Sequence, residues 1–208
     1  MKHKATYSKI KYFFVVIIIV LMFNSCGFCN VFSTQFYFEN QGGVRPGKNR
    51  FKFRKNPYLL KDQDLIKVNC VYQLKIITNS SNLKNQSNDS VAYNYIRFFK
   101  NGRFIINKLN SNKESHLEQY NNLKGGEVGY YQIIENELIL EYFNVRLGGM
   151  SSDCGQYYKD KYKMTKNGIK LQSVRRSNNG TFYAWRTVEN ENWFYKKNIE
   201  GLKGETYW

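Results

Sequence analysis

The chain is 208 residues long and strongly basic, with 32 Lys and Arg residues against 16 Asp and Glu residues and a net charge of +16. Its 17 Tyr, 15 Phe and only two Pro residues favour a β protein, because aromatic side chains suit a half-buried pleated sheet. A cytosolic chain this basic would suggest nucleic-acid binding. The export signal described next excludes that class, and leaves anionic lipid, acidic glycans, a protein partner or solubility alone to explain the charge.

The N-terminus has the layout of a secretory signal. Four lysines lie ahead of an apolar run over residues 12–23, and small residues follow that run. The run is too short to cross a bilayer comfortably. We therefore predict that residues 1–25 are a signal peptide of the lipoprotein type. A plain cleaved signal and an uncleaved anchor over residues 12–32 are the alternatives.

Residues 23–27 read Phe-Asn-Ser-Cys-Gly and resemble the lipobox of bacterial lipoproteins, in the looser form common among the Bacteroidetes. The resemblance implies that Cys26 is acylated, for example with palmitate, and becomes the first mature residue. It implies a protein held in the cell envelope by its lipid. Surface-exported lipoproteins of that group have acidic residues just after the cysteine, whereas none occurs here before Glu39. We therefore expect an outer-membrane lipoprotein that faces the periplasm.

Residues 26–57 are predicted to be a basic tether, because glycines and prolines interrupt any long element. Phe51 and Phe53 alternate with basic residues there, and such a segment beside an acylated cysteine suits an anionic lipid surface. The alternative is a solvated linker that ends in one short edge strand. The basic residues assigned to the membrane surface are Arg45, Lys48, Arg50, Lys52, Arg54 and Lys55.

Residues 58–208 are predicted to form one all-β domain. A period of two over residues 65–77 puts Cys70, Tyr72 and Leu74 on one face of a strand. Turns at residues 100–102, 135–136 and 166–168 predict three hairpins, and Asn-Gly is typical of such turns. A charged stretch around residues 111–122 is predicted to be a short helix or a loop. About eight short strands predict an antiparallel meander that closes into a barrel, since closure removes exposed edges, with a β-sandwich as the alternative.

Three segments are similar to small lipocalin-like lipoproteins of Bacteroidetes. They are Tyr-Ile-Arg-Phe-Phe-Lys-Asn-Gly-Arg-Phe at 95–104, Gly-Tyr-Tyr-Gln-Ile-Ile at 129–134 and Asn-Glu-Leu-Ile-Leu-Glu at 136–141. The similarity covers roughly residues 64–174. It implies a lipocalin-like barrel.

The sequence offers no set of residues for catalysis. His116 is the only histidine outside the leader, and no serine lies in a Gly-x-Ser-x-Gly turn. The glycine-rich stretch at 42–49 has Asn49 where a phosphate-binding loop needs Ser or Thr. Glu137 and Glu141 are predicted to lie about 14 Å apart on the solvated face of one strand, too far apart for a glycosidase pair. We predict no catalytic residue, metal or cofactor.

The predicted function is a non-catalytic module that binds an apolar or glycan ligand. The aromatic residues proposed as ligand contacts are Tyr130, Tyr142, Tyr157, Tyr162 and Trp185. At least half of them are expected to fill the barrel instead. The alternative function is an envelope inhibitor or immunity-type protein that binds another protein through its basic loops. Cys70 and Cys154 are predicted either to form a disulfide or to stay as two buried thiols.

Overall fold

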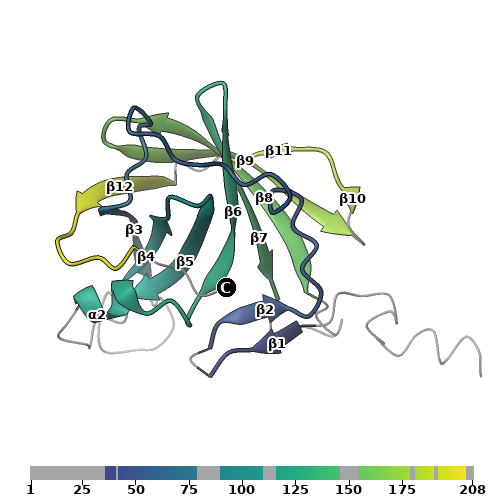
Figure 1. The fold of residues 1–208 in the computed structure, drawn as a ribbon, viewed down its shortest axis with the longest axis horizontal. Helices are drawn as coiled ribbons and strands as arrows, with labels where there is room; N and C mark the ends of the chain where they lie inside the picture. Colours follow the sequence, from purple (N-terminus) through teal and green to yellow (C-terminus); the bar gives the residue numbers. More distant parts are fainter. Residues whose placement is uncertain are drawn as a thin grey trace, which may run out of the picture. The chain divides into compact units, whose positions relative to one another are not determined.

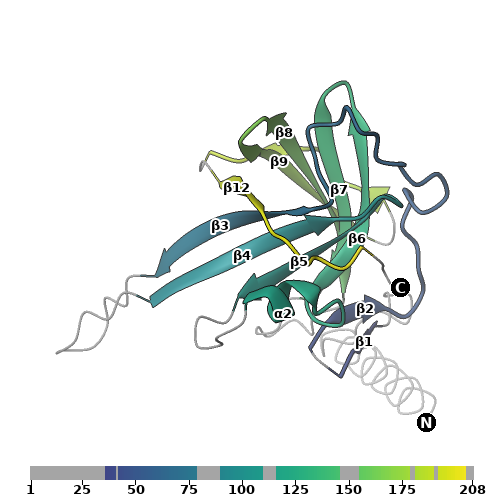
Figure 2. The ribbon, with the colours of Figure 1, turned by 60° about the vertical axis from the view of Figure 1, so that its left-hand side comes forward.

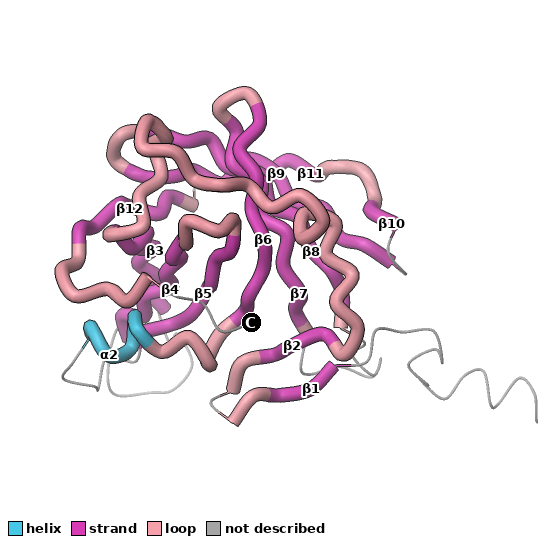
Figure 3. The backbone as a smooth tube through the Cα atoms, in the orientation of Figure 1, coloured by secondary structure: helices cyan, strands magenta, loops and turns pink. Residues whose placement is uncertain are grey.

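The computed structural model describes residues 36–40, 42–78, 90–109, 116–145, 155–178, 181–189 and 192–204. These residues belong to one compact unit that is almost entirely β structure (Figure 1, Figure 3). The strands are β1 (Phe36–Phe38), β2 (Val44–Pro46), β3 (Cys70–Thr78), β4 (Ser90–Phe98), β5 (Arg103–Leu109), β6 (Glu127–Ile134), β7 (Glu137–Asn144), β8 (Gln156–Thr165), β9 (Gly168–Asn178), β10 (Thr181–Phe182), β11 (Arg186–Thr187) and β12 (Trp193–Asn198), and the helix is α2 (His116–Asn121).

Eight of these strands form a closed antiparallel barrel. Strands β3 to β9 pair in chain order, and β12 pairs with β9 on one side and with β3 on the other. Figure 2 shows the long β3–β4 pair extending from the barrel wall. The predicted barrel is confirmed, and the sandwich alternative is excluded. Each of the eight strands therefore pairs with a neighbour on both sides, so none of them is an edge strand of an open sheet.

Short turns fix this order of strands. The β6–β7 turn places Glu135 and Asn136 at φ 50° and 67°, the positive values that a type I′ turn requires. Gly102 in the β4–β5 turn has φ 76°, and a Cβ atom there would lie 2.6 Å from the carbonyl oxygen of Tyr58. The three predicted hairpins are therefore present at the predicted positions.

The barrel is packed at the end where these turns lie, which we call the closed end. Tyr58, Leu60 and Ile66, from the segment that leads into β3, pack against the inward side chains there. The strands alternate as predicted, since Cys70, Tyr72 and Leu74 all belong to this core. The other core residues are Ile96, Phe98, Phe104, Ile106, Tyr131, Ile133, Leu138, Leu140, Tyr142, Tyr162, Met164, Ile169, Leu171 and Phe194.

The helix and the C-terminal residues cover the outside of β3, β4 and β5. Tyr120 of α2 is buried with Val71, Tyr95 and Leu109, and the hydroxyl of Tyr95 donates a 2.7 Å hydrogen bond to a helix carbonyl. Arg97 is fully buried on the same face. Its guanidinium donates to carbonyl oxygens of the helix and of the C-terminal segment.

The domain begins earlier than the sequence pattern predicted. Residues 36–57 were assigned to a tether, but β1 and β2 form a hairpin and β2 pairs with β6. Phe51 is only 5% exposed, because it packs on the outer face of the barrel against Tyr130 and Tyr157. These described residues are therefore part of the folded domain.

Candidate ligand-binding site in the barrel lumen

The barrel interior changes character toward the end opposite the turns, which we call the open end. Inward side chains at the closed end are buried and mostly apolar, as Phe98, Phe104 and Leu140 illustrate. Inward side chains near the open end are only half-buried, and several are polar. They are Leu74, Asn94, Ile106, Glu127, Tyr142 and Asn144. The exposure of the inward side chains therefore rises from the packed apolar closed end toward the open end, and we call the inner face of the barrel at the open end the lumen.

A buried carboxyl lies on the inner face of the barrel wall. Asp160 is 6% exposed and projects inward from β8. The hydroxyl of Tyr142 donates to its Oδ2 atom at 3.0 Å, and the hydroxyl of Tyr162 lies 3.5 Å from the same atom. The other oxygen, Oδ1, is buried without a hydrogen-bond partner. Burial raises the pKa of Asp160 to about 7, although the two tyrosine hydroxyls partly offset this.

Glu127 is a second carboxyl in the same lumen. It projects from β6, and the side-chain amide of Asn144 donates to its Oε1 atom at 2.6 Å. Burial and the charge of Asp160 raise the pKa of Glu127 to about 7, while Lys108 opposes the shift. Each carboxyl is therefore held near the midpoint of its titration at neutral pH.

Tyrosine rings line the wall beside these carboxyls. Tyr142 and Tyr158 stack with ring centroids 5.4 Å apart, and Tyr142 meets Phe104 edge-on at 6.5 Å. Burial raises the pKa values of Tyr142 and Tyr162 well above the ordinary 10.0. Their hydroxyls therefore stay protonated and act as hydrogen-bond donors at neutral pH.

The outer wall behind these residues carries a second charged row, and there the charges are paired. Glu141 and Lys159 face each other across β7 and β8, with Nζ 3.5 Å from Oε1. Phe53 covers the pair: its backbone N–H donates to Glu141 Oε2 at 2.8 Å, and Lys159 Nζ lies 3.7 Å from its ring centroid. Glu141 is only 1% exposed, so the solvated position predicted for it is corrected.

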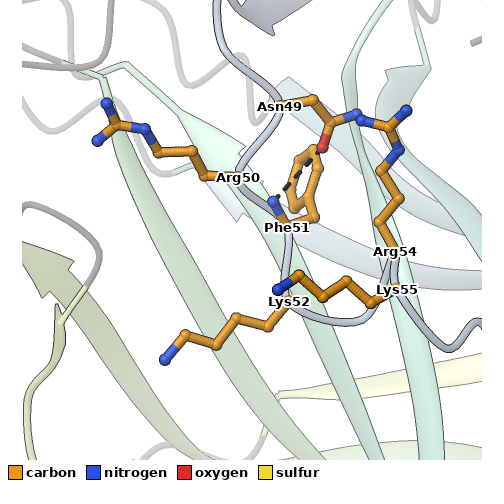
Figure 4. A pocket seen from close by; sticks show the side chains of 6 residues that line it. All are labelled: Asn49, Arg50, Phe51, Lys52, Arg54 and Lys55. Atoms are coloured by element: carbon orange, nitrogen blue, oxygen red, sulfur yellow. Dashed lines mark hydrogen bonds between the residues drawn. The ribbon is translucent and has the colours of Figure 1, made fainter.

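The segment over residues 49–55 forms a hollow of about 720 Å³ (Figure 4). Arg50 and Lys52 point to one side of it and Arg54 to the other, and all three are exposed. Lys48 and Lys55 are exposed as well. The residues that line the hollow are Asn49, Arg50, Phe51, Lys52, Arg54 and Lys55.

Arg45 differs from the other basic residues of this region, and its predicted place on a membrane surface is corrected. Its side chain is 5% exposed. The guanidinium donates to the carbonyl oxygens of Val44 at 3.0 Å and Gly126 at 2.9 Å. Burial lowers its pKa, and Glu39 partly opposes that effect. Arg45 therefore ties the β1–β2 hairpin to the loop ahead of β6.

The five aromatic residues predicted as ligand contacts separate into two groups. Tyr142 and Tyr162 face the lumen. Tyr130 and Tyr157 pack around Phe51 outside the barrel. Trp185 also lies outside, with its ring 4.4 Å from the guanidinium of Arg175 and 5.3 Å from Lys161 Nζ.

The two lumen carboxyls were not predicted from the sequence. The usable signal was the alternation over residues 156–165, which places Asp160 on the same side of its strand as Tyr158, Tyr162 and Met164. The flanking Lys159 and Lys161 obscured it, because charged neighbours suggest a solvated strand.

Cys70 is a free, buried thiol at the closed end, where its Sγ donates to Asn198 Oδ1 at 3.0 Å. Burial raises its pKa. Cys154, the predicted disulfide partner, lies outside the described residues. The structure therefore has Cys70 as a thiol and not in a disulfide. The predicted signal peptide and Cys26 also lie outside the described residues.

His116 is exposed at the start of α2. The part of the chain that the structure describes contains no group of three His, Cys, Asp or Glu residues able to hold a metal ion. Its one helix is too short to cross a membrane. Comparison with protein-family models, with curated proteins and with solved structures finds no match.

Proposed function

We propose that the protein is a lipid-anchored envelope protein whose barrel is a non-catalytic binding module, with the lumen as its ligand site. The observation that carries the ligand site is the difference between the two ends of the barrel. Tyr58, Leu60 and Ile66 close one end, whereas the inward side chains near the other end are half-buried and include Tyr142. Ligand pockets combine apolar and aromatic walls with a few polar groups, and this lumen has both.

The proposed ligand has an apolar or sugar-like body. The stacked rings of Tyr142 and Tyr158 offer an aromatic wall, and Leu74 and Ile106 offer apolar contacts across the barrel from it. Polar groups lie beside this wall: the hydroxyls of Tyr142 and Tyr162, which donate to Asp160, and the side-chain amide of Asn144, which donates to Glu127. Polar groups held in place in this way orient a ligand, while burial of its apolar part contributes most of the affinity.

Blocking the lumen tests this site. Leu74→Trp places a large side chain inside the barrel, whereas Lys75→Trp adds the same side chain to the outer face of the same strand. We expect the wild type and Lys75→Trp to bind Nile red, an uncharged apolar fluorescent probe, with equal affinity. Leu74→Trp should bind it at least 10-fold more weakly. Equal binding by all three proteins would contradict the lumen as the site.

The lipid anchor is proposed on the lipobox-like residues around Cys26 and is tested separately. Cells grown with a clickable fatty acid should label the wild type and Cys29→Ala equally, because Cys29 lies outside the lipobox-like stretch. Cys26→Ala should carry no label. Label that persists in Cys26→Ala would refute the anchor without touching the proposal for the lumen.

Binding of another protein is the second candidate function, and the hollow at residues 49–55 favours it. Its exposed Arg50, Lys52 and Arg54 would suit an acidic partner surface. Crosslinking in intact cells, followed by mass spectrometry, should recover a partner that is lost when these three residues are replaced by Glu. Recovery of the same partner from the charge-reversed protein would exclude this surface.

A further inference from the structure

The two carboxyls of the lumen, Asp160 and Glu127, are not balanced by a buried cation among the described residues. The chain carries a net charge of +16, yet neither Asp160 nor Glu127 forms an ion pair with any described residue. The closest comparison is Glu141 on the other face of the same wall, which is paired with Lys159. A buried carboxylate without a cation is costly, so its retention calls for a compensating group.

Two buried acceptor atoms on inward-facing residues lack a hydrogen-bond partner. Asp160 is more than nine-tenths buried, and its Oδ1 atom has no hydrogen-bond donor. The Oδ1 atom of Asn94, on the inner face of β4, is also buried without a partner. Both atoms are acceptors, so a ligand that satisfies either one carries a hydrogen-bond donor. A primary ammonium group supplies three donors and one positive charge.

We propose that the lumen binds a small organic amine, with its ammonium group held by Asp160 and Glu127 and its apolar or aromatic body against Tyr142 and Tyr158. This inference rests on the proposed lumen site and names the class of its ligand. Tyrosine faces attract a cation held near their rings, which adds to the charge pairing. An anionic ligand would meet two carboxyls and is excluded by the same reasoning.

The charge state of the site suits a ligand with a single positive charge. Two carboxyls whose pKa values are both raised to about 7 carry about one negative charge between them at neutral pH. The described ionisable groups that face this lumen are Lys108 on β5, Glu127 on β6, Tyr142 on β7, Tyr158, Asp160 and Tyr162 on β8, and Arg176 on β9. Lys108 and Arg176 are exposed, so neither is a buried counter-ion for the site.

Calorimetry on the full-length protein in detergent tests the proposal with matched probes. Phenethylamine and phenethyl alcohol share one body and differ in the charged group, as hexylamine and hexanol do. At pH 8 we expect each amine to bind with Kd below about 1 mM, at least 10-fold tighter than its alcohol. At pH 5.5 a carboxyl of pKa about 7 is mostly protonated, so the amines should bind about 30-fold more weakly.

Asp160→Asn keeps the shape of the side chain and removes the charge, and should weaken amine binding at least 10-fold at pH 8. Glu137→Gln removes a carboxyl from the outer face, where it pairs with Lys161 at 2.7 Å, and should leave amine binding unchanged. Alcohols that bind as tightly as the amines, and lose affinity in Leu74→Trp, would overturn the amine while leaving the lumen site in place. If none of the four probes binds, the amine proposal fails, and the comparison of Leu74→Trp with Lys75→Trp decides the lumen site separately. Amine binding that survives in Asp160→Asn also refutes the proposal.

Discussion

Asp160→Asn should stabilise the protein at alkaline pH, because the buried carboxylate is a cost that the asparagine avoids. The pKa of Asp160 rises from an ordinary 3.8 to about 7 in the folded protein. The folded state therefore binds this proton more tightly than the unfolded chain does. Stability from this group is fully present below pH 3.8 and is lost as the pH rises toward 7.

The size of the effect follows from that difference in pKa. At 1.36 kcal/mol per pH unit it amounts to about 4 kcal/mol over the whole range, and about 3 kcal/mol of this falls between pH 5 and pH 8. An asparagine at 160 still accepts a hydrogen bond from Tyr142, so the folded structure is retained. We expect the free energy of unfolding of Asp160→Asn, relative to the wild type, to be about 3 kcal/mol larger at pH 8 than at pH 5.

Urea unfolding of both proteins at the two pH values measures this difference. Titrating groups far from residue 160 contribute equally to both proteins and cancel in the comparison. Glu127 does not cancel, because the charge of Asp160 raises its pKa; the lower pKa of Glu127 in Asp160→Asn shifts the difference in the same direction. Glu137→Gln serves as the control, because its half-exposed ion pair should change stability by no more than about 1 kcal/mol at either pH. An Asp160→Asn variant with the same relative stability at pH 5 and pH 8 would show that the carboxyl is not desolvated, and would refute the reasoning.

Three further outcomes are expected for the packing of the domain. Arg97→Met should lower the free energy of unfolding by about 2–4 kcal/mol in urea, because it leaves the buried carbonyl oxygen of Tyr120 unpaired and removes the bond to the C-terminal segment. A loss below about 1 kcal/mol would contradict this role. Gly129→Ala should lower the free energy of unfolding by at least about 2 kcal/mol, because its Cβ would lie 2.0 Å from the carbonyl oxygen of Glu141. Gly204→Ala is the control and should be neutral, because nothing lies within 4 Å of a Cβ there. Equal losses in the two variants would refute the contact. Wild type and Cys70→Ser should run at the same position on a gel without reductant, because Cys70 is a free thiol. A mobility shift on reduction that the wild type shows and Cys70→Ser lacks would show that Cys70 forms a disulfide.

The barrel itself could be predicted from the sequence because its determinants are local. Alternation in β3 and the Asn-Gly turns depend on residues close together in the chain, and the structure retains both. Arg45 and Glu141 were misplaced for the opposite reason. Each is buried by a segment far away in the sequence: Arg45 by the loop ahead of β6, and Glu141 by Phe53, 88 residues before it. Their charge predicts exposure, and only tertiary contacts reverse that expectation.

The lumen site was missed because β8 carries charged residues on both faces. Lys159 and Lys161 point outward and Asp160 points inward, and consecutive charges in one strand normally indicate a solvent-exposed face. The two faces differ in what surrounds the charges. Outside, Lys159 is paired with Glu141 beneath Phe53. Inside, Asp160 has only tyrosine hydroxyls, which cannot neutralise it.

This contrast across one strand is what favours a ligand over a purely structural network. A chain with 32 basic residues places Lys159 next to Asp160 and pairs it with the outer carboxylate instead. Glu141 on the outside has a counter-ion, whereas Asp160 on the inside has none among the described residues. The Asp160 carboxylate lowers the stability of the folded protein, because it is desolvated without a counter-ion. Such a cost is expected where a site is kept ready for a charged group that arrives from solution. The amine proposed for the lumen is a group of that kind, and its binding would offset the desolvation cost of the Asp160 carboxylate.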